Sequence, residues 1–256
     1  MSGLSAIDRK DLIEGLGRGL RMIEAFDDEH PRLSPSEAAA RTGLTRTAAR
    51  RYLLSLVHFG YADTDGRQFW LSPRVLRLGQ SYLGAARLPR LVQPFIQRIS
   101  MKCGETVNVS VLDGHEVVYV ARSNPPRVVS IGYHAGARVP AHVVTPGVVM
   151  LGTLDDEPLD AWIAAHDFSV FTPQTVTDPD VFRQHARGAR ALGYWITEQQ
   201  LDLGLCGIAT ALRDRKGECK GAVGMTLPST AYTQDQLRDR LLPLLQEAAQ
   251  SLRPLL

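Results

Sequence analysis

The chain has 256 residues, of which 44% are hydrophobic and 22% are charged. This length predicts one or two domains, and the apolar content excludes a disordered chain or a small disulfide scaffold. The formal net charge is only +2. A protein that binds nucleic acid through bulk charge is therefore excluded, and any nucleic-acid surface must be local.

Cysteine usage and the N-terminal sequence indicate the compartment. The three cysteines, Cys103, Cys206 and Cys219, are far apart and form no CxxC pair, so we expect a reducing environment with neither disulfides nor a metal site. Charged residues occupy positions 8–11 and 14, where a signal peptide would need an apolar core. No apolar run is long enough to cross a bilayer. We therefore expect a soluble cytoplasmic protein without a membrane partner.

The first sixty residues predict three helices. Apolar residues at helical spacing indicate an amphipathic first helix that ends at the acidic run 27–29. Residues 34–37 (Ser-Pro-Ser-Glu) form a capping box, so a second helix begins there and ends at Gly43. Thr45 can cap a third helix, from Arg46 to His58, after only one turn. The apolar residues of the first helix are Ile13, Leu16, Leu20, Ile23 and Phe26.

A hairpin follows these helices. Two strand-like runs, 61–64 and 67–71, flank Asp65-Gly66, and Asp-Gly between such runs is the strongest short hairpin signal. Two helices joined by a short glycine-containing turn describe a helix-turn-helix. With the hairpin, the order of elements predicts a winged helix-turn-helix.

The third helix carries a candidate DNA-contacting surface. Its apolar residues from Ala49 to Leu56 share one face, whereas Arg46 and Arg50, four positions apart, lie on the opposite face. Arginine can pair with guanine or contact phosphate, and threonine can contact base edges. A merely solvated arginine face is the alternative. The candidate DNA contacts, including one arginine at the tip of the wing, are Thr45, Arg46, Thr47, Arg50, Arg51 and Arg67.

The pattern changes after position 72. Residues 73–87 predict a linker helix, and a further helix begins at about 88. Strands are expected at 107–112, 116–121, 127–131, 205–212 and 219–227, and a terminal helix is expected after Thr233. Strands with hairpin joins and flanking helices predict an α+β domain with an antiparallel sheet. Another helix is expected from Pro179 to Gly193, with its inward residues at Phe182, Ala186, Ala189 and Leu192.

The sequence resembles the IclR family of bacterial transcriptional regulators. The similarity is most specific at residues 14–26, 42–53, 60–61 and 71–76, and it points to the branch that regulates protocatechuate, 4-hydroxybenzoate and β-ketoadipate catabolism. The resemblance implies a winged-helix domain (11–72), a linker helix (73–87) and a GAF-like effector-binding domain (88–256). It also implies a homodimer or dimer of dimers that binds a double-stranded operator, with no cofactor and no enzymatic activity.

The resemblance also implies an effector pocket. Thr145 and Pro146 match loop positions that contact a small carboxylate in the family, and the helix that follows would offer free backbone N–H groups. Gly207 and Gln200 replace a family Ser or Cys and a family acid, which predicts a less polar pocket and, as a hypothesis, an aromatic acid. The matched pocket positions are Ile131, Thr145, Pro146, Thr197, Leu205, Gly207, Gly224 and Thr226.

The sequence contains no recognisable catalytic motif. GxSxG, HExxH and Walker A patterns are absent, and the seven histidines show no i, i+4 pair. His142, beside the effector loop, is interpreted either as a carboxylate ligand or as a hydrogen-bonded structural residue. We expect a ligand-responsive regulator of a catabolic operon. The alternatives are a DNA-binding module fused to a small-molecule enzyme domain and an architectural DNA-binding protein without a ligand.

Overall fold

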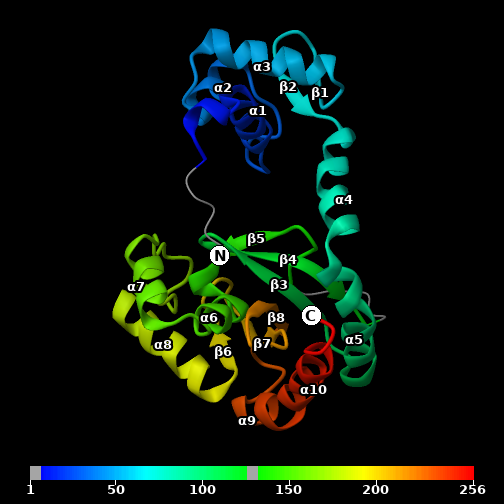
Figure 1. Ribbon diagram of the computed structural model, residues 1–256, viewed down its shortest axis with the longest axis vertical. Helices are drawn as coiled ribbons and strands as arrows, with labels where there is room; N and C mark the ends of the chain where they lie inside the picture. The colour runs from blue at the N-terminus through cyan, green and yellow to red at the C-terminus, as the bar shows by residue number, and fades with distance from the viewer. Residues whose placement is uncertain (1–6, 126–131) are drawn as a thin grey trace. The chain divides into compact units, whose positions relative to one another are not determined.

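The computed structural model describes residues 7–125 and 132–256 (Figure 1). The chain divides into two compact units, Met1–Tyr82 and Leu83–Leu256. The strand expected at 127–131 lies outside the described residues. None of the described helices is both long enough and apolar enough to span a bilayer.

The first unit is a winged helix-turn-helix, as predicted. A short 3-10 turn at Arg9–Asp11 precedes three helices, α1 (Glu14–Glu24), α2 (Pro35–Thr42) and α3 (Arg46–His58), and a hairpin of β1 (Ala62–Thr64) and β2 (Phe69–Leu71) follows. One apolar core joins these elements. Its side chains with the least exposure include Met22, Leu33, Ala38, Ala49 and Leu53.

Local hydrogen bonds begin and end α2 and α3 where the sequence indicates. Ser34 Oγ accepts from the Glu37 amide at 3.3 Å, and Glu37 Oε2 accepts from the Ser34 amide at 2.7 Å, which completes the capping box. Gly43 ends α2 in the left-handed region at φ 68°. Thr45 Oγ1 then accepts from the Ala48 amide at 3.2 Å and caps α3.

The face that α1 buries differs from the expected one. Ile13 is 78% exposed and Leu16 is 63% exposed, whereas Met22 is fully buried. Ile23 and Phe26 only pack partly against the core. The apolar spacing therefore predicted the helix correctly but not its buried side, because periodicity shows that an apolar face exists and not which neighbour covers it.

The second unit contains a six-stranded antiparallel sheet. The strands β3 (Val107–Asp113), β4 (Glu116–Ser123), β7 (Leu205–Arg213) and β8 (Cys219–Pro228) were predicted, and β5 (Arg138–Pro140) and β6 (Trp195–Glu198) were not. The spatial order is β5-β4-β3-β8-β7-β6. The predicted fold class, a winged helix-turn-helix followed by an α+β domain with an antiparallel sheet, is thus confirmed.

Helices cover both faces of this sheet (Figure 1). After a 3-10 turn (Pro73–Val75) and α4 (Leu76–Ala85), the helix α5 (Arg87–Cys103) packs with α10 (Leu242–Leu252) on one face. On the opposite face lie α6 (Thr145–Leu151), α7 (Asp156–Ala164) and α8 (Pro179–Leu192). Because side chains alternate along a strand, β3 directs Val107 and Val109 toward α5 and directs Asn108 and Ser110 toward α6.

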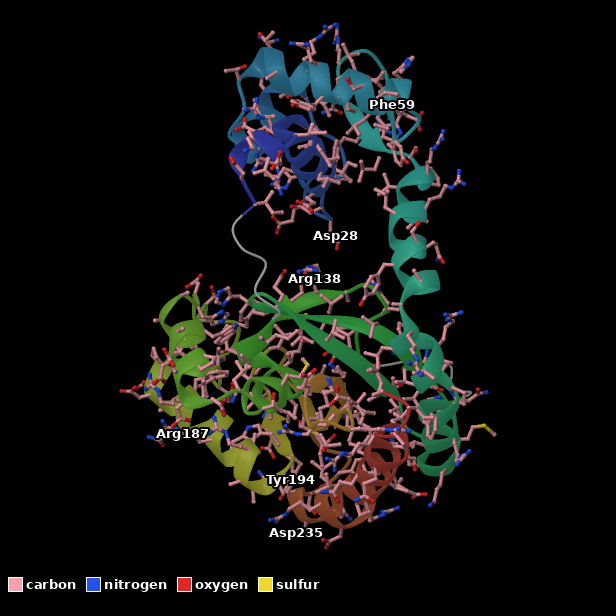
Figure 2. All side chains as sticks on the ribbon, in the orientation of Figure 1. Asp28, Phe59, Arg138, Arg187, Tyr194 and Asp235 are labelled. Carbon is pink, nitrogen blue, oxygen red and sulfur yellow. The ribbon has the colours of Figure 1, made fainter. Side chains whose placement is uncertain are left out.

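The outer helices show one further correction. Phe182, Ala186 and Ala189 of α8 are buried as predicted, but Leu192 is 56% exposed because the chain leaves the helix at Gly193 in the left-handed region. Arg187, labelled in Figure 2, joins α8 to the start of α7 through Asp156, with Nη2 to Oδ2 at 2.8 Å.

The chain's last helical segment begins, as predicted, at a capping box on Thr233. It runs through α9 (Gln234–Gln236) and a π-helical turn (Leu237–Leu241) into α10. Leu245 and Leu252 of α10 are fully buried against the sheet. The terminal helix thereby closes one of the two cores of this unit.

Candidate DNA-binding surface and effector pocket

The outer side of α3 is a polar, cationic surface. Ala49, Leu53 and Leu56 are buried in the core, so the opposite side of the helix points outward. All the polar residues predicted there are exposed. They are Thr45, Arg46, Thr47, Arg50 and Arg51.

These arginines differ from Arg41, which precedes them in the sequence. Arg41 forms an ion pair with Asp27, and its Nε donates to the Ala25 carbonyl at 2.7 Å. Within residues 7–125 and 132–256, no carboxylate pairs with Arg46, Arg50 or Arg51. Of these four arginines, Arg41 therefore makes contacts within the domain. The other three can donate to phosphate oxygens or base edges.

The wing tip is held rigidly while its arginine is left exposed. Asp65 Oδ1 accepts from the amides of Arg67 at 2.9 Å and Gln68 at 2.8 Å, and these bonds lower the pKa of the Asp65 carboxyl. Arg67 itself is exposed. Sequence reasoning missed a second cation at the wing: the Arg32 guanidinium lies over the Trp70 ring, 4.2 Å from its centroid. No sequence spacing indicates that pair, because it depends on the fold.

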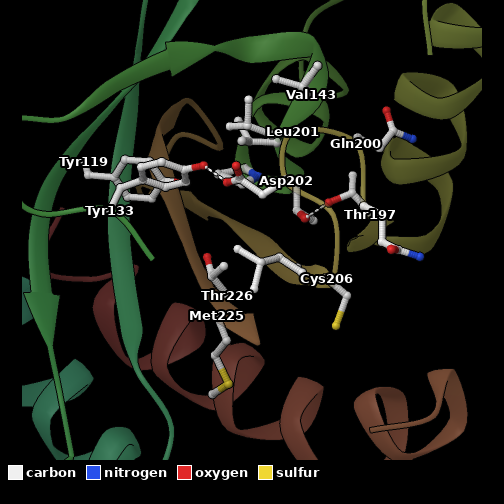
Figure 3. A pocket seen from close by; sticks show the side chains of 16 residues that line it. Tyr119, Tyr133, Val143, Thr197, Gln200, Leu201, Asp202, Cys206, Met225 and Thr226 are labelled. Carbon is white, nitrogen blue, oxygen red and sulfur yellow. Dashed lines mark hydrogen bonds between the residues drawn. The ribbon is translucent and has the colours of Figure 1, made fainter. Parts of the chain in front are cut away.

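The sheet and α6 line a cavity, partly open to solvent, in the second unit (Figure 3). Six of the eight predicted effector positions line it. Gly224 instead lines a smaller neighbouring cavity, and Ile131 lies outside the described residues. The six that line the larger cavity are Thr145, Pro146, Thr197, Leu205, Gly207 and Thr226.

A hydroxyl pair explains the glycine at position 207. Thr145 Oγ1 and Thr197 Oγ1 share a hydrogen bond inside the cavity (Figure 3). A Cβ atom on Gly207 would lie 2.3 Å from Thr145 Oγ1, which is far inside van der Waals contact. The glycine is therefore required for the threonine pair, and the pair supplies polar groups where a side chain at position 207 would otherwise lie.

The residues that sequence reasoning missed include an acid and two tyrosines. The Tyr133 hydroxyl donates to the Asp202 carboxylate, and the Tyr133 ring stacks on Tyr119 with centroids 5.3 Å apart (Figure 3). Burial raises the pKa of both tyrosine hydroxyls, so both are neutral donors at physiological pH. Gln200 accepts from the Val176 amide at 3.2 Å. Asp202, two residues later, brings a carboxylate to the pocket, which is consequently more polar than the sequence suggested.

The expected free N–H groups at the start of α6 are largely occupied. Pro146 has no N–H, and the amides of Gly147 and Val148 both donate to the Val144 carbonyl, at 3.0 and 3.3 Å. The helix is also only seven residues long. Among the described lining residues there is no Lys, Arg or His. An anion here would therefore depend mainly on side-chain hydroxyls for hydrogen bonds.

His142 has a structural role. It is 1% exposed, and its ring nitrogens lie 3.0 Å from the Ser169 carbonyl and 2.7 Å from His166 Nε2. Burial lowers the pKa of His142, and burial beside His142 lowers the pKa of His166 to about 4. Neither histidine lines the cavity. No grouping of His, Cys, Asp and Glu suited to a metal ion occurs in the part of the chain that the structure describes.

The thiol of Cys206 borders the cavity but is not activated. The residue is buried, and burial raises the pKa of its thiol to about 11. The nucleophile is the thiolate, so a raised pKa makes this cysteine a poor nucleophile. Its apolar neighbours include Ile208 and Leu227 in the same core.

A winged helix with free arginines, followed by an α+β domain that encloses a polar cavity, is the architecture of a ligand-responsive DNA-binding regulator. Residues 15–66 match the IclR helix-turn-helix domain, and residues 80–253 match the bacterial transcriptional regulator IclR C-terminal domain. The chain belongs to the IclR family.

The relatives of the chain are regulators. The p-hydroxybenzoate hydroxylase transcriptional activator of Acinetobacter baylyi is 39% identical over 97% of this chain and 94% of its own length. The Pca operon regulatory protein of the same organism is 33% identical over 98% and 91%. The inducer-binding domain of an Acinetobacter PobR double mutant, solved with 3-hydroxybenzoic acid, is 34% identical and covers 67% of this chain and all of its own, with a TM-score of 0.63. This chain is thus a DNA-binding transcriptional regulator and not an enzyme, and the enzyme-fusion alternative is not favoured.

Proposed function

We propose that this regulator controls a catabolic operon for aromatic acids and that a small hydroxylated aromatic carboxylate binds in the cavity beside α6. The observation that carries the proposal is the convergence of six family-matched positions on one cavity. The relatives named for p-hydroxybenzoate and Pca regulation support this effector class.

The cavity provides both kinds of contact that such an acid needs. Leu205 and Met225 offer apolar surface to an aromatic ring, with the stacked Tyr119 and Tyr133 beside them. Thr145 and Thr197 share one hydrogen bond, so the pair keeps one hydroxyl hydrogen that can donate to a carboxylate at the other side of the cavity. Hydrogen bonds to a charged group are worth about 1.5–3 kcal/mol each, so a few neutral donors are enough to bind the carboxylate.

At the operator, the exposed side of α3 would read the major groove while the wing contacts the backbone. The contacting residues would be Thr45, Arg46, Thr47, Arg50, Arg51 and Arg67. A homodimer or dimer of dimers presents two such helices to a pseudo-palindrome, with half-sites ~10 bp or a multiple apart. Residues 11–72 would form the DNA-binding part, 73–87 the linker and 88–256 the effector-binding part. Since its target is chromosomal DNA, the protein would act in the cytoplasm.

Effector binding would act by shifting a two-state equilibrium. A ligand that prefers one arrangement of the effector-binding domains changes the spacing of the paired DNA-binding domains through the linker helix. This changes either operator affinity or promoter activation.

Calorimetric titration of the full chain tests the proposal. We expect saturable binding of 4-hydroxybenzoate or protocatechuate and no binding of adipate, an aliphatic diacid that cannot stack on the tyrosines. In the Thr145→Val variant, which keeps the shape but removes the hydroxyl, affinity should fall by about tenfold. Absence of binding by every aromatic acid tried would refute the effector class.

A further inference from the structure

One buried amide in the second unit has no hydrogen-bond partner. Asn108 lies on β3 and is only 4% exposed, yet neither its Nδ2 nor its Oδ1 has a partner among residues 7–125 and 132–256. Leaving a buried polar group unpaired costs about 1–3 kcal/mol. Such a group in a native protein calls for an explanation, such as a ligand that the group receives.

The amide faces a cavity that adjoins the effector pocket. Asn108 and the buried Ser110 line the smaller cavity. Tyr119, Pro146, Met225 and Thr226 line this cavity and the larger one. The two cavities therefore adjoin at these four residues, and a ligand seated in the larger cavity has the smaller one beside it.

The strand pairing keeps the space above the amide open. Asn108 is directly opposite Arg122 on β4 and Gly224 on β8, and the missing side chain at position 224 leaves the amide uncovered on the β8 side. No larger residue fits at position 224, because its Cβ would lie 2.7 Å from the Ile208 carbonyl oxygen and 2.8 Å from Ala209 Cβ. The sheet thus forms a recess whose floor is polar and whose wall is fixed.

The chemistry of the amide selects the group that would occupy the recess. A primary amide offers donors on Nδ2 and an acceptor on Oδ1. A carboxylate only accepts, so it would leave Oδ1 unpaired. A neutral hydroxyl can donate to Oδ1 or accept from Nδ2, so it can pair the acceptor that a carboxylate leaves unpaired.

We propose that Asn108 is a specificity-determining residue that binds the ring hydroxyl of the aromatic effector. This inference rests on the proposed function, and it fixes the orientation of the ligand. The carboxylate lies toward Thr145 and Thr197, the ring lies along Met225, and the hydroxyl reaches the recess. The regulator consequently discriminates hydroxybenzoates from benzoate, because benzoate leaves the amide unpaired.

Calorimetry on the full chain tests this assignment with 3-hydroxybenzoate, 4-hydroxybenzoate and benzoate. For the better hydroxybenzoate, the wild-type affinity should exceed that for benzoate by at least about tenfold. The Asn108→Leu variant replaces the amide by an apolar group of similar size. It should still bind benzoate, but the ratio of its affinities for hydroxybenzoate and benzoate should fall to about one. Asn108→Ala, which adds no bulk, should lose the preference likewise and serves if the leucine variant does not fold.

Ser100 provides the matched control. Its Oγ is another buried atom without a partner in the described ranges, but it lies on α5 and lines neither cavity. Ser100→Ala should therefore keep the wild-type preference for the hydroxylated acid.

The possible failures are distinguishable. A wild type that binds none of the three acids overturns the proposed function together with this inference. A wild type that binds hydroxybenzoate and benzoate equally, or Asn108 variants that keep the full preference, overturn only the inference.

Discussion

The close approach at position 207 permits a quantitative prediction for Gly207→Ala. The added Cβ would lie 2.3 Å from Thr145 Oγ1 and 3.4 Å from Thr197 Oγ1, so Thr145 must rotate away and its hydrogen bond to Thr197 breaks. Overpacking of a core costs about 1–3 kcal/mol, and a lost hydrogen bond costs about 0.5–1.5 kcal/mol. We therefore expect the free energy of unfolding to fall by about 2–4 kcal/mol. Urea unfolding followed by tryptophan fluorescence measures this, because Trp162 and Trp195 lie in the same unit.

A double-mutant cycle isolates the cause. In the Thr145→Ala background the hydroxyl that the new Cβ would strike is absent, so Gly207→Ala should lower the free energy of unfolding by about 1 kcal/mol or less. The two substitutions should then show a coupling energy of about 1–3 kcal/mol, in the range of residues in direct contact. Additive effects, or a neutral Gly207→Ala, would refute the explanation of this glycine.

Three further predictions concern the DNA-binding surface, a cap and a buried histidine. Arg50→Ala should weaken operator binding, measured by anisotropy, by about 1–3 kcal/mol if the residue reads a base. Arg41→Ala should lower the free energy of unfolding, measured in urea, by about 1 kcal/mol through its lost bonds. A destabilised Arg50→Ala variant, with weaker operator binding only in Arg41→Ala, would contradict this division of the arginines. Ser34→Ala should destabilise the first unit by about 1 kcal/mol, and an unchanged urea midpoint would show that the capping box contributes nothing. The pKa of His166 is lowered to about 4 by burial and by its histidine neighbours. The unfolded state therefore binds more protons below pH 6.5, and the free energy of unfolding should decline from pH 7 to pH 5. The decline should be smaller in His166→Gln, and equal declines in the two proteins would contradict the lowered pKa of His166.

The DNA-binding unit could be predicted because its signals are local. The capping box at Ser34, the left-handed Gly43 and the cap at Thr45 each act within four residues, so the sequence alone determines where α2 begins and ends and where α3 begins. The buried side of α1 was predicted wrongly because it depends on which neighbours pack against the helix. Arg41 illustrates the same limit, since its partner Asp27 lies fourteen positions away.

The effector pocket could be predicted only in part. Positions such as Thr145 and Thr197 came from a family resemblance, and the structure places them at one cavity. Tyr133 and Asp202, which are 69 positions apart, carry no mutual signal in the sequence. Asn108 could not be identified either, because a polar residue in a strand does not reveal whether a partner faces it. The expectation of free backbone N–H groups at the start of α6 was wrong, because two of these groups donate to the Val144 carbonyl.

The central claim is that an aromatic acid in the cavity beside α6 controls transcription at the operator. In vitro transcription from the regulated promoter tests it most directly, with wild type and Thr145→Val compared over a titration of 4-hydroxybenzoate or protocatechuate. The account predicts that the acid changes the transcript level with wild type and that the variant needs about tenfold more acid for the same change. A transcript level that depends on the regulator but ignores every aromatic acid, or an identical response from the variant, would contradict it.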